Sequence, residues 1–367
     1  MTSSGKGTFF CYLSVSQSQT RMTVGHERGT ERMKRNRIKW GTAILAATIL
    51  VTGCGGNAQQ ESGESGAGED LTKVKVVLDW TPNTNHTGLY VARDKGFYEE
   101  YGLEVEIISP PETGADQLIA SGGAEFGVSY QEAITQARVQ DVPIVSIAAV
   151  IQHNTSGFAA PVAKNIQSPA DFEGMRYGGW GNPVEEAVIA ALMQEAGADV
   201  NKVEFINSSA DFFTATAQDI DFAWIYYAWT GVEAELRGEE IDMLYVKDYS
   251  EALDYYTPVL ATNEQMIAER PEVVRAFIAA TSEGYRYAID QPEEAAELLI
   301  AAEPDLNEEL VRASQIWLSP RYQEDADRWG EQKPEVWLNY MEWMADHGVL
   351  EGRIDTEAAF TNEFLPE

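Results

Sequence analysis

The sequence has 367 residues, 44% of them hydrophobic, which is long enough for two domains and a sizeable core. It has 59 acidic and 26 basic residues and a formal net charge of −33, a field that repels nucleic acid and excludes it as a partner. The two cysteines, Cys11 and Cys54, predict no disulfide framework. His86, His153 and His347 have no metal-ligand spacing, and we expect neither a metal nor a cofactor.

The first 54 residues are predicted to be a lipoprotein signal peptide. Residues 33–54, MKRNRIKWGTAILAATILVTGC, combine a basic head, an apolar run too short for a comfortable membrane span and a small residue before Cys54. The ending VTGC resembles a bacterial lipobox, which implies that Cys54 is lipidated; the alternative is a signal-anchor helix with an incidental cysteine. Residues 1–32 precede Met33, so a translation start at Met33 is also open.

Residues 55–71 are rich in Gly, Ser and Glu and are predicted to be a flexible linker. A lipid on Cys54 followed by this tether would hold a folded body at the outer face of the cytoplasmic membrane, at the cell surface or in the periplasm. We therefore expect an exported, membrane-anchored monomer.

Strand and helix patterns alternate after the linker. Short β-branched or alternating runs between turn residues predict strands, and apolar residues at helical spacing predict the helices between them. In chain order we expect a strand at 74–80, a helical region at 86–102, a strand at 103–110, a helix and then a strand within 113–130, a helix from 130 that stops before Pro143, and a buried strand at 144–152. This order is typical of a parallel sheet covered on both faces.

A second lobe is predicted from residue 167 to 256. Its clearest element is a helix at 182–197, where Asn182 suits the N-cap, Pro183 the first turn and Glu185 the reciprocal capping position. From residue 257 the chain returns to the first lobe with one strand, two helices and a helical tail. We thus expect lobe 1 at 72–166 and 257–367, lobe 2 at 167–256, and a cleft between them.

Three stretches carry a family resemblance, and they are DWTPNTNHTGLYVARDKGFYEEYGLEVEI (79–107), GVSYQEAITQARVQDVPIVSIAAV (127–150) and LATNEQMIAERPEVVRAFIAATSEGYRYAIDQPEEAAELL (260–299). They resemble the solute-binding proteins of ABC importers, and within them the branch shared by thiamine-pyrimidine binders and the fungal pyrimidine synthase. The likeness runs from Val74 to about Ile300.

The resemblance implies an α/β, periplasmic-binding-protein-like fold of two hinged lobes that close over a small molecule. It also implies partners: an ABC permease and its ATPase, on which the closed form docks. The implied ligand is a small heteroaromatic thiamine precursor, a formylaminopyrimidine or hydroxymethylpyrimidine, held between aromatic rings. Binders of riboflavin, sulfonate or taurine, and nitrate share the same frame, so these solutes remain alternatives.

Residues at the predicted strand ends also suit a flat heteroaromatic ligand. Carboxyl ends of parallel strands converge on one edge of a sheet, aromatic rings there can stack on a planar ring, and amides or a carboxylate can read its edge. The predicted ligand-binding residues are Trp80, Asn83, His86, Tyr130, Trp180, Glu186 and Tyr226.

Each choice has an alternative. Trp80 and Tyr130 could be core residues, and His86 could only order its turn. Glu186 is preferred to Glu185 because Glu185 already fits a capping box. The face of the strand at 221–229 that lines the cleft is not decided by the alternation.

The sequence argues against catalysis. At positions where the fungal synthase carries a lysine that holds pyridoxal phosphate and a histidine one turn later, this chain has Ser129 and Ala133. Without an amine no Schiff base can form, and the cysteine-rich iron motif of that enzyme is missing as well. We expect a binding protein, not an enzyme; a sensor or adhesion lipoprotein that kept the cleft is the other non-enzymatic alternative.

Overall fold

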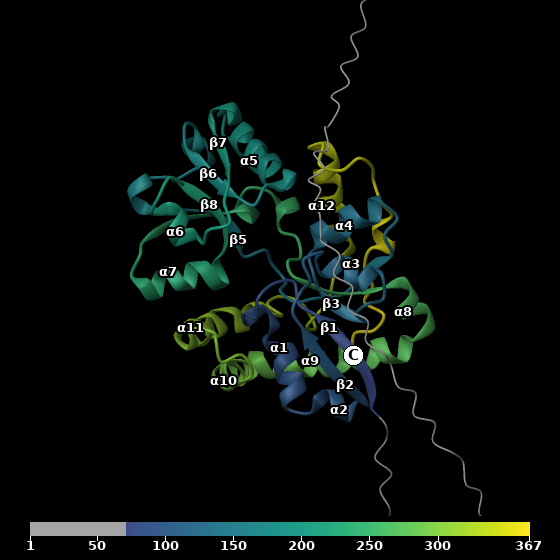
Figure 1. Cartoon of the computed structure of the whole chain (residues 1–367). Helices are drawn as coiled ribbons and strands as arrows, with labels where there is room; N and C mark the ends of the chain where they lie inside the picture. Colours follow the sequence, from purple (N-terminus) through teal and green to yellow (C-terminus); the bar gives the residue numbers. More distant parts are fainter. Residues whose placement is uncertain (1–70) are drawn as a thin grey trace, which may run out of the picture. The chain divides into compact units, whose positions relative to one another are not determined.

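The computed structural model describes residues 71–367, which form two β-sheets with helices packed against them (Figure 1). The predicted signal peptide, the proposed lipidation site Cys54 and the linker up to residue 70 lie outside the described residues. Within the described part of the chain, no helix is long and apolar enough to cross a membrane.

The first sheet contains the strands predicted before residue 150 and one strand that comes much later in the chain. Its spatial order is β2 (Leu103–Ile108), β1 (Thr72–Val77), β3 (Phe126–Ser129), β10 (Val259–Asn263) and β4 (Ile144–Ala149). β1 pairs in parallel with β2 and β3, but β10 runs antiparallel between β3 and β4. The prediction of a parallel sheet is therefore wrong in this strand. Periodicity marks a strand without giving its neighbours or direction, and β10 enters only after the chain has left the second sheet.

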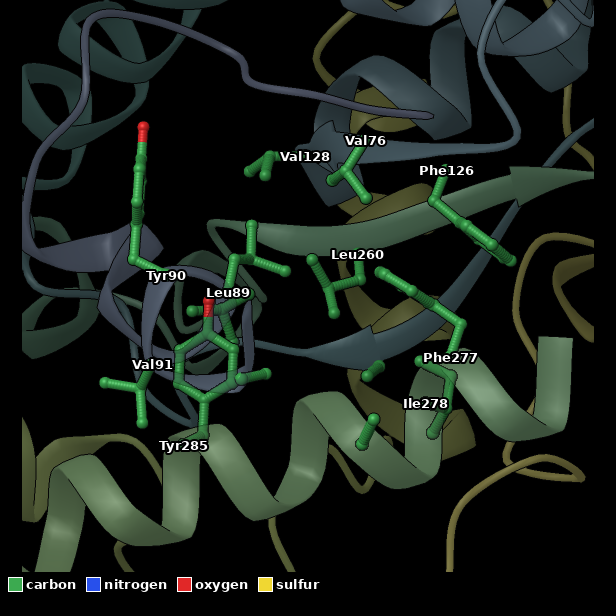
Figure 2. Packing of buried hydrophobic residues seen from close by; sticks show 14 of the residues in the cluster. Val76, Leu89, Tyr90, Val91, Phe126, Val128, Leu260, Phe277, Ile278 and Tyr285 are labelled. Atoms are coloured by element: carbon green, nitrogen blue, oxygen red, sulfur yellow. The ribbon is translucent and has the colours of Figure 1, made fainter. Parts of the chain in front are cut away.

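Strand alternation in β1 builds two cores, one on each face of this sheet. Val76 lies in the same cluster as Phe126 and Phe277, whose rings stack with centroids 3.9 Å apart (Figure 2). Val77 belongs to the cluster on the opposite face, together with Trp337. The expectation that helices cover both faces is confirmed.

The helices divide between these two faces. Those that contribute to the Val76 cluster are α1 (Thr87–Asp94), α2 (Phe97–Glu100), α9 (Pro271–Asp290), α10 (Pro292–Ala302) and α11 (Glu308–Leu318), with α8 (Glu264–Glu269) at its edge. Those on the Val77 face are α3 (Ala115–Ala120), α4 (Gln131–Val139) and α12 (Pro334–Asp346). The tail helix α12 also places Tyr340, Met341 and Met344 in the core of the second lobe.

The second sheet has the spatial order β7 (Glu204–Asn207), β6 (Arg176–Gly179), β8 (Phe222–Tyr226), β5 (Ser156–Pro161) and β9 (Ile241–Tyr245). Helix α5 (Pro183–Glu195) packs on one face, and α6 (Phe212–Thr216) and α7 (Val232–Arg237) on the other. β5 pairs with β8 and β9, so this sheet begins before residue 167, where the sequence put the start of the second lobe. The sequence SGFAAP has no β-branched residue, and for this reason the strand was not predicted.

Short helical turns connect these elements: η1 (Thr84–His86), η2 (Val162–Lys164), η3 (Pro169–Phe172), η4 (Val200–Lys202), η6 (Val246–Asp248), η7 (Glu251–Leu253), η8 (Ser319–Arg321) and η9 (Thr356–Ala358). The turn η5 (Tyr227–Gly231), directly after β8, is a π-helix. Single π-turns of this kind occur frequently at functional sites.

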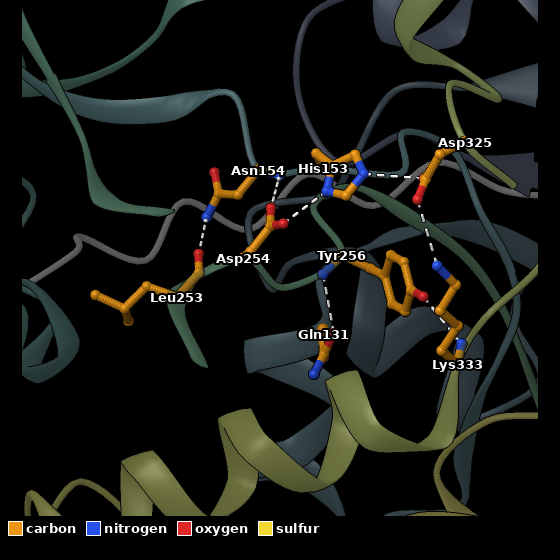
Figure 3. A network of polar contacts seen from close by, with 8 residues as sticks. All are labelled: Gln131, His153, Asn154, Leu253, Asp254, Tyr256, Asp325 and Lys333. Carbon is orange, nitrogen blue, oxygen red and sulfur yellow. Dashed lines mark hydrogen bonds and ion pairs between the residues drawn. The ribbon is translucent and has the colours of Figure 1, made fainter. Parts of the chain in front are cut away.

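Two segments link the sheets, one between β4 and β5 and one between β9 and β10, and a polar network ties them together (Figure 3). The ring of His153 lies 2.6 Å from the carboxylate of Asp254 and 3.0 Å from that of Asp325. The hydrogen bond with Asp254 is the main reason why the pKa of His153 is raised, to about 9, so this imidazole is charged at neutral pH. A cation thus joins both crossing segments and the tail.

Candidate ligand-binding site

A cavity of about 300 Å³ lies between the two sheets, next to the carboxyl ends of β1, β3, β6 and β8. The first lobe and the crossing segment contribute Asp79, Trp80, Asn83, Asn85, Tyr130 and Pro258, and the second lobe contributes Trp180, Trp224, Ile225, Tyr226, Trp229 and Thr230. This is the place where open α/β sheets bind ligands. Its lining is mainly aromatic.

Two indole rings of the cavity are exposed, unlike the two tryptophans that lie in the cores. Trp80 is 56% exposed and Trp180 54% exposed, whereas Trp329 and Trp337 are buried in the cores. Trp180 lies against Trp224 with ring centroids 6.0 Å apart and an interplanar angle of 57°. Large exposed indoles facing a cavity are costly in water and are typical of a surface that binds an apolar or planar partner.

The carboxylate of Asp79 is the main polar group of the cavity. Nε2 of His86 lies 2.6 Å from its Oδ1, and the hydroxyl of Tyr130 donates to Oδ2. The backbone N–H of Asn83 donates to Nδ1 of His86, so the ring hydrogen is on Nε2 and is donated to Asp79. Burial would raise the pKa of Asp79, but the hydrogen bonds from His86 and Tyr130 outweigh it, and the pKa is lowered.

Further acidic groups lie near the cavity. Burial, and then the negative charges of Glu132, Asp79 and Glu185, raise the pKa of the Tyr226 phenol, so this hydroxyl stays protonated and able to donate. Burial also raises the pKa of Glu132, against a hydrogen bond from Tyr255. Among the described residues that line the cavity there is no lysine or arginine. Its field is therefore negative.

The loop after β1 is held by its own side chains. The amide oxygen of Asn83 accepts from the N–H of Asn85 at 2.9 Å, and its Nδ2 donates to the carbonyl of Thr81 at 3.0 Å. Asn83 thus shapes the loop, while the side chain of Asn85, one residue beyond Thr84, lines the cavity beside it.

Five of the seven predicted residues come together at this cavity: Trp80, Asn83, Tyr130, Trp180 and Tyr226. His86 does not line it. Its side chain is fully buried behind Asp79, where both ring nitrogens are engaged, so its place is that of a positioning residue. The alternative that His86 orders its turn is the one the geometry favours.

Glu186 does not line the cavity either. It borders a separate surface hollow together with Glu185, Asn182 and Phe205. The expected capping box is confirmed: Glu185 accepts from the N–H of Asn182 at 2.6 Å, and it also accepts from Tyr177.

The sequence gives no prediction for four lining residues, which are Asp79, Ile225, Thr230 and Pro258. Asn85, Trp224 and Trp229 also line the cavity; they lie near predicted strand ends, where a shared cleft is expected, but they are not among the predicted ligand contacts. Asp79 directly precedes Trp80 at the same strand end, and this position could have indicated that it lines the cavity. Trp224 and Tyr226 share a face by strand alternation and both line the cavity, but Ile225 between them lines it as well, so the contact is not confined to one face of the strand. Tyr227 packs instead against Trp317 with ring centroids 5.3 Å apart.

Residues 83–295 match the model of the NMT1/THI5 like family. The chain belongs to this family. It is 30% identical to the formylaminopyrimidine-binding protein of Halalkalibacterium halodurans, over 87% of this chain and 97% of that one. It is also 25% identical to the 4-amino-5-hydroxymethyl-2-methylpyrimidine phosphate synthase of Legionella pneumophila, over 81% of this chain and 93% of the enzyme.

The fold is similar to that of the periplasmic aliphatic sulphonate binding protein SsuA from Escherichia coli. The TM-score is 0.63 with 14% identity, over 80% of this chain and 94% of that one. The predicted periplasmic-binding-protein-like fold with two α/β lobes is confirmed. Similarity thus extends to binding proteins and to a synthase. Only the residues of the site can indicate which of these two activities this chain has.

Proposed function

We propose that this protein is the solute-binding component of an ABC importer and captures a small aminopyrimidine precursor of thiamine, of the formylaminopyrimidine or hydroxymethylpyrimidine type. The observation that carries the proposal is the ionised Asp79 in a cavity walled by the exposed indoles of Trp80 and Trp180. The likeness to a formylaminopyrimidine-binding protein along nearly the whole of both chains supports it.

The chemistry of an aminopyrimidine complements this cavity. Its planar ring can stack on indole faces, each good contact contributing about 1 kcal/mol beyond area burial. Its amino group presents N–H donors, and the carboxylate of Asp79 is an acceptor that His86 and Tyr130 already hold in place. A hydrogen bond to a charged partner is worth about 1.5–3 kcal/mol.

Anionic solutes fit less well. A sulfonate or nitrate at about 5 Å from the Asp79 carboxylate would be repelled by about 3 kcal/mol at an effective dielectric constant of 20. The residues described around the cavity include no lysine or arginine to offset this repulsion. We therefore rank sulfonate and nitrate below pyrimidines. The ammonium group of taurine could pair with Asp79, but its sulfonate would meet no cation in the described lining, and we rank it below pyrimidines as well.

Riboflavin is disfavoured on size. A cavity of about 300 Å³ is at the lower end of the volumes that hold small organic ligands, which suits a single ring better than a tricyclic one.

Binding is favoured over synthesis. The described cavity lining contains no amine that could form a Schiff base with pyridoxal phosphate, and Ser129 and Ala133 occupy the positions where the resemblance implied the lysine and histidine of the fungal enzyme. The ligand would be released unchanged to a permease and its ATPase. A sensor or adhesion protein would use the same cavity without such a partner.

We also propose that the protein is exported as a monomer and anchored through a lipid on Cys54, with residues 55–71 as the tether. Metabolic labelling with an alkyne fatty acid should mark the wild-type chain and leave Cys54→Ala unmarked. Labelling of the variant would refute the anchor.

Isothermal titration calorimetry on a chain beginning at residue 71 tests the ligand. We expect binding of formylaminopyrimidine or 4-amino-5-hydroxymethyl-2-methylpyrimidine, and none of taurine, nitrate or riboflavin. Mass spectrometry of ligand released from the purified protein provides an independent identification. Tight binding of taurine or nitrate without binding of either pyrimidine would overturn the proposed ligand.

A further inference from the structure

A buried chain of hydroxyl groups connects the cavity walls contributed by the two lobes. The Oγ atoms of Thr84 and Ser314 are 2.6 Å apart, and the hydroxyl of Ser314 donates to the backbone carbonyl of Ala228. Because Ser314 has one hydroxyl hydrogen and gives it to Ala228, Thr84 must donate to Ser314. The order of donation is Thr84, Ser314, Ala228.

Each end of this relay lies inside a segment that lines the cavity. Thr84 is in η1, between the lining residues Asn83 and Asn85. Ala228 is in the π-helix η5, directly before the lining residues Trp229 and Thr230.

The middle of the relay comes from a third element. Ser314 is on α11, which lines no part of the cavity, and its side chain is fully buried. Ala228 is buried too, and it lies in the hydrophobic cluster of the first lobe although its own chain segment continues from a strand of the second sheet. The relay therefore spans the division between the lobes.

The loop on the first-lobe side is held in place by two buried tyrosines. The hydroxyl of Tyr322 donates to the carbonyl of Thr84, and the hydroxyl of Tyr285 donates to the carbonyl of Asn85 at 2.7 Å. Both tyrosines are buried in the first-lobe core, where their rings pack edge to face with centroids 5.1 Å apart. Because η1 is anchored in this way, the hydrogen bonds through Ser314 fix the position of η5 relative to η1.

We propose that Ser314 is a positioning residue that latches the second-lobe wall, Trp229 and Thr230, to the first-lobe loop around Thr84, and so holds both walls in register for the ligand. This inference rests on the proposed function only for the ligand used in one of its two tests. Loss of the hydroxyl leaves the Ala228 carbonyl and the Thr84 hydroxyl without partners when the walls are together, whereas water satisfies both groups when the walls separate.

Ser319 provides a matched control. It is a buried serine directly after α11, and its hydroxyl lies 2.8 Å from the backbone carbonyls of both Ala288 and Gln315, all of them in the first lobe. Ser319→Ala removes a comparable bond, together with the one that Nε2 of Gln315 donates to this hydroxyl, and it leaves Thr84, Ser314 and Ala228 in place. A purely structural role of Ser314 predicts equal behaviour of the two variants.

The test uses Ser314→Ala, Thr84→Val, the double variant and Ser319→Ala in the chain beginning at residue 71. The first readout is calorimetric affinity for 4-amino-5-hydroxymethyl-2-methylpyrimidine. We expect a loss of roughly tenfold for Ser314→Ala, the equivalent of one net buried hydrogen bond, and no additional loss in the double variant because one relay is broken in both cases. Ser319→Ala should keep the wild-type affinity while losing a similar amount of thermal stability.

The second readout needs no ligand. Amide hydrogen exchange in the ligand-free protein should become faster at 83–86 and at 227–231 in Ser314→Ala, and at neither segment in Ser319→Ala. Unchanged exchange at both segments in Ser314→Ala, or losses of affinity that add in the double variant, would overturn the latch. If the wild type bound no pyrimidine, the proposed function would fail while the exchange experiment still decided the latch.

Discussion

Replacing Asp79 by Asn removes a charge from the cavity and changes its shape very little. In the wild type both carboxylate oxygens accept, Oδ1 from Nε2 of His86 at 2.6 Å and Oδ2 from the Tyr130 hydroxyl. An asparagine has one acceptor oxygen, and its NH₂ group must face one of these two donors. The variant is therefore expected to lose one of the bonds that hold position 79, together with the charge offered to a ligand.

The expected magnitude follows from the type of bond. A hydrogen bond to an ionised partner contributes about 1.5–3 kcal/mol, which is a loss of roughly 10- to 150-fold in affinity. The pKa of Asp79 is lowered below its usual 3.8, so its contribution is complete above that value and is lost only as the pH falls through the lower folded-state pKa. The affinity ratio of wild type to variant should consequently stay constant between about pH 5 and pH 8.

Calorimetric titration with 4-amino-5-hydroxymethyl-2-methylpyrimidine measures this loss. Asp219→Asn is the control, because it removes the same charge from a side chain that is 86% exposed. A wild-type affinity in Asp79→Asn would refute the reasoning that this carboxylate binds the amino group. So would an equal loss in Asp219→Asn, which would indicate a general effect of net charge.

Three other predictions concern the stacking wall, the crossing segments and a close helix contact. Trp80→Ala should weaken binding of an aromatic ligand by about 1–3 kcal/mol in the same titration, because an exposed indole wall is removed. His153→Gln should lower the unfolding free energy below about pH 6.5, by at most about 3 kcal/mol for a pKa raised to about 9, and the difference should vanish as the pH rises through 9. Gly284→Ala should destabilise by about 1–3 kcal/mol in thermal unfolding, because its Cβ would lie 2.1 Å from the carbonyl oxygen of Gly88, whereas Gly352→Ala meets nothing within 4 Å.

Each of these has a contrary result. An unchanged affinity would remove Trp80 from the site. A stability difference at His153 that persists unchanged at pH 10 would show that charge is not its cause. Equal melting temperatures for Gly284→Ala and the wild type would mean that helices α1 and α9 separate easily at this contact.

The strands and helices before residue 150 were predictable because each keeps a clear local pattern. Val74 and Val76 alternate with lysines in β1, and the helices after it have glycines and a proline at their ends. What could not be predicted is pairing. β10 pairs with β3 and β4 only after the chain has passed through the whole second sheet, and β5 pairs with β9 at the far end of that sheet's sequence. Nothing in a strand's own residues encodes a partner about 100 residues away.

The site divides in the same way. Trp80 and Tyr130 are predictable because they lie at the ends of predicted strands, and the position of a strand end is local information. Asp79 was overlooked since a carboxylate at a strand end is usually solvated, and only the tertiary contact with Tyr130 shows that it is held in the cavity. The prediction of Glu186 rests on the capping role of Glu185, and that role says nothing about where the first turn of α5 lies; both carboxylates border the separate hollow.

The nine residues Leu78–His86 explain why one strand end can organise most of the first-lobe wall. An ionised carboxylate with a side chain only 7% exposed is expensive unless donors compensate it, and the chain supplies one of them, His86, seven residues after Asp79. The N–H of Asn83 donates to Nδ1 of His86, so the ring hydrogen of His86 is on Nε2 and is donated to Asp79. The two donors leave free lone pairs on the Asp79 carboxylate. Asp79 can therefore accept a hydrogen bond from a ligand that is a donor, and it repels a ligand that carries negative charge. The aromatic wall of the second lobe has no such arrangement within one short segment. It is held by contacts with distant parts of the chain, such as the hydrogen bond from Ser314 to Ala228.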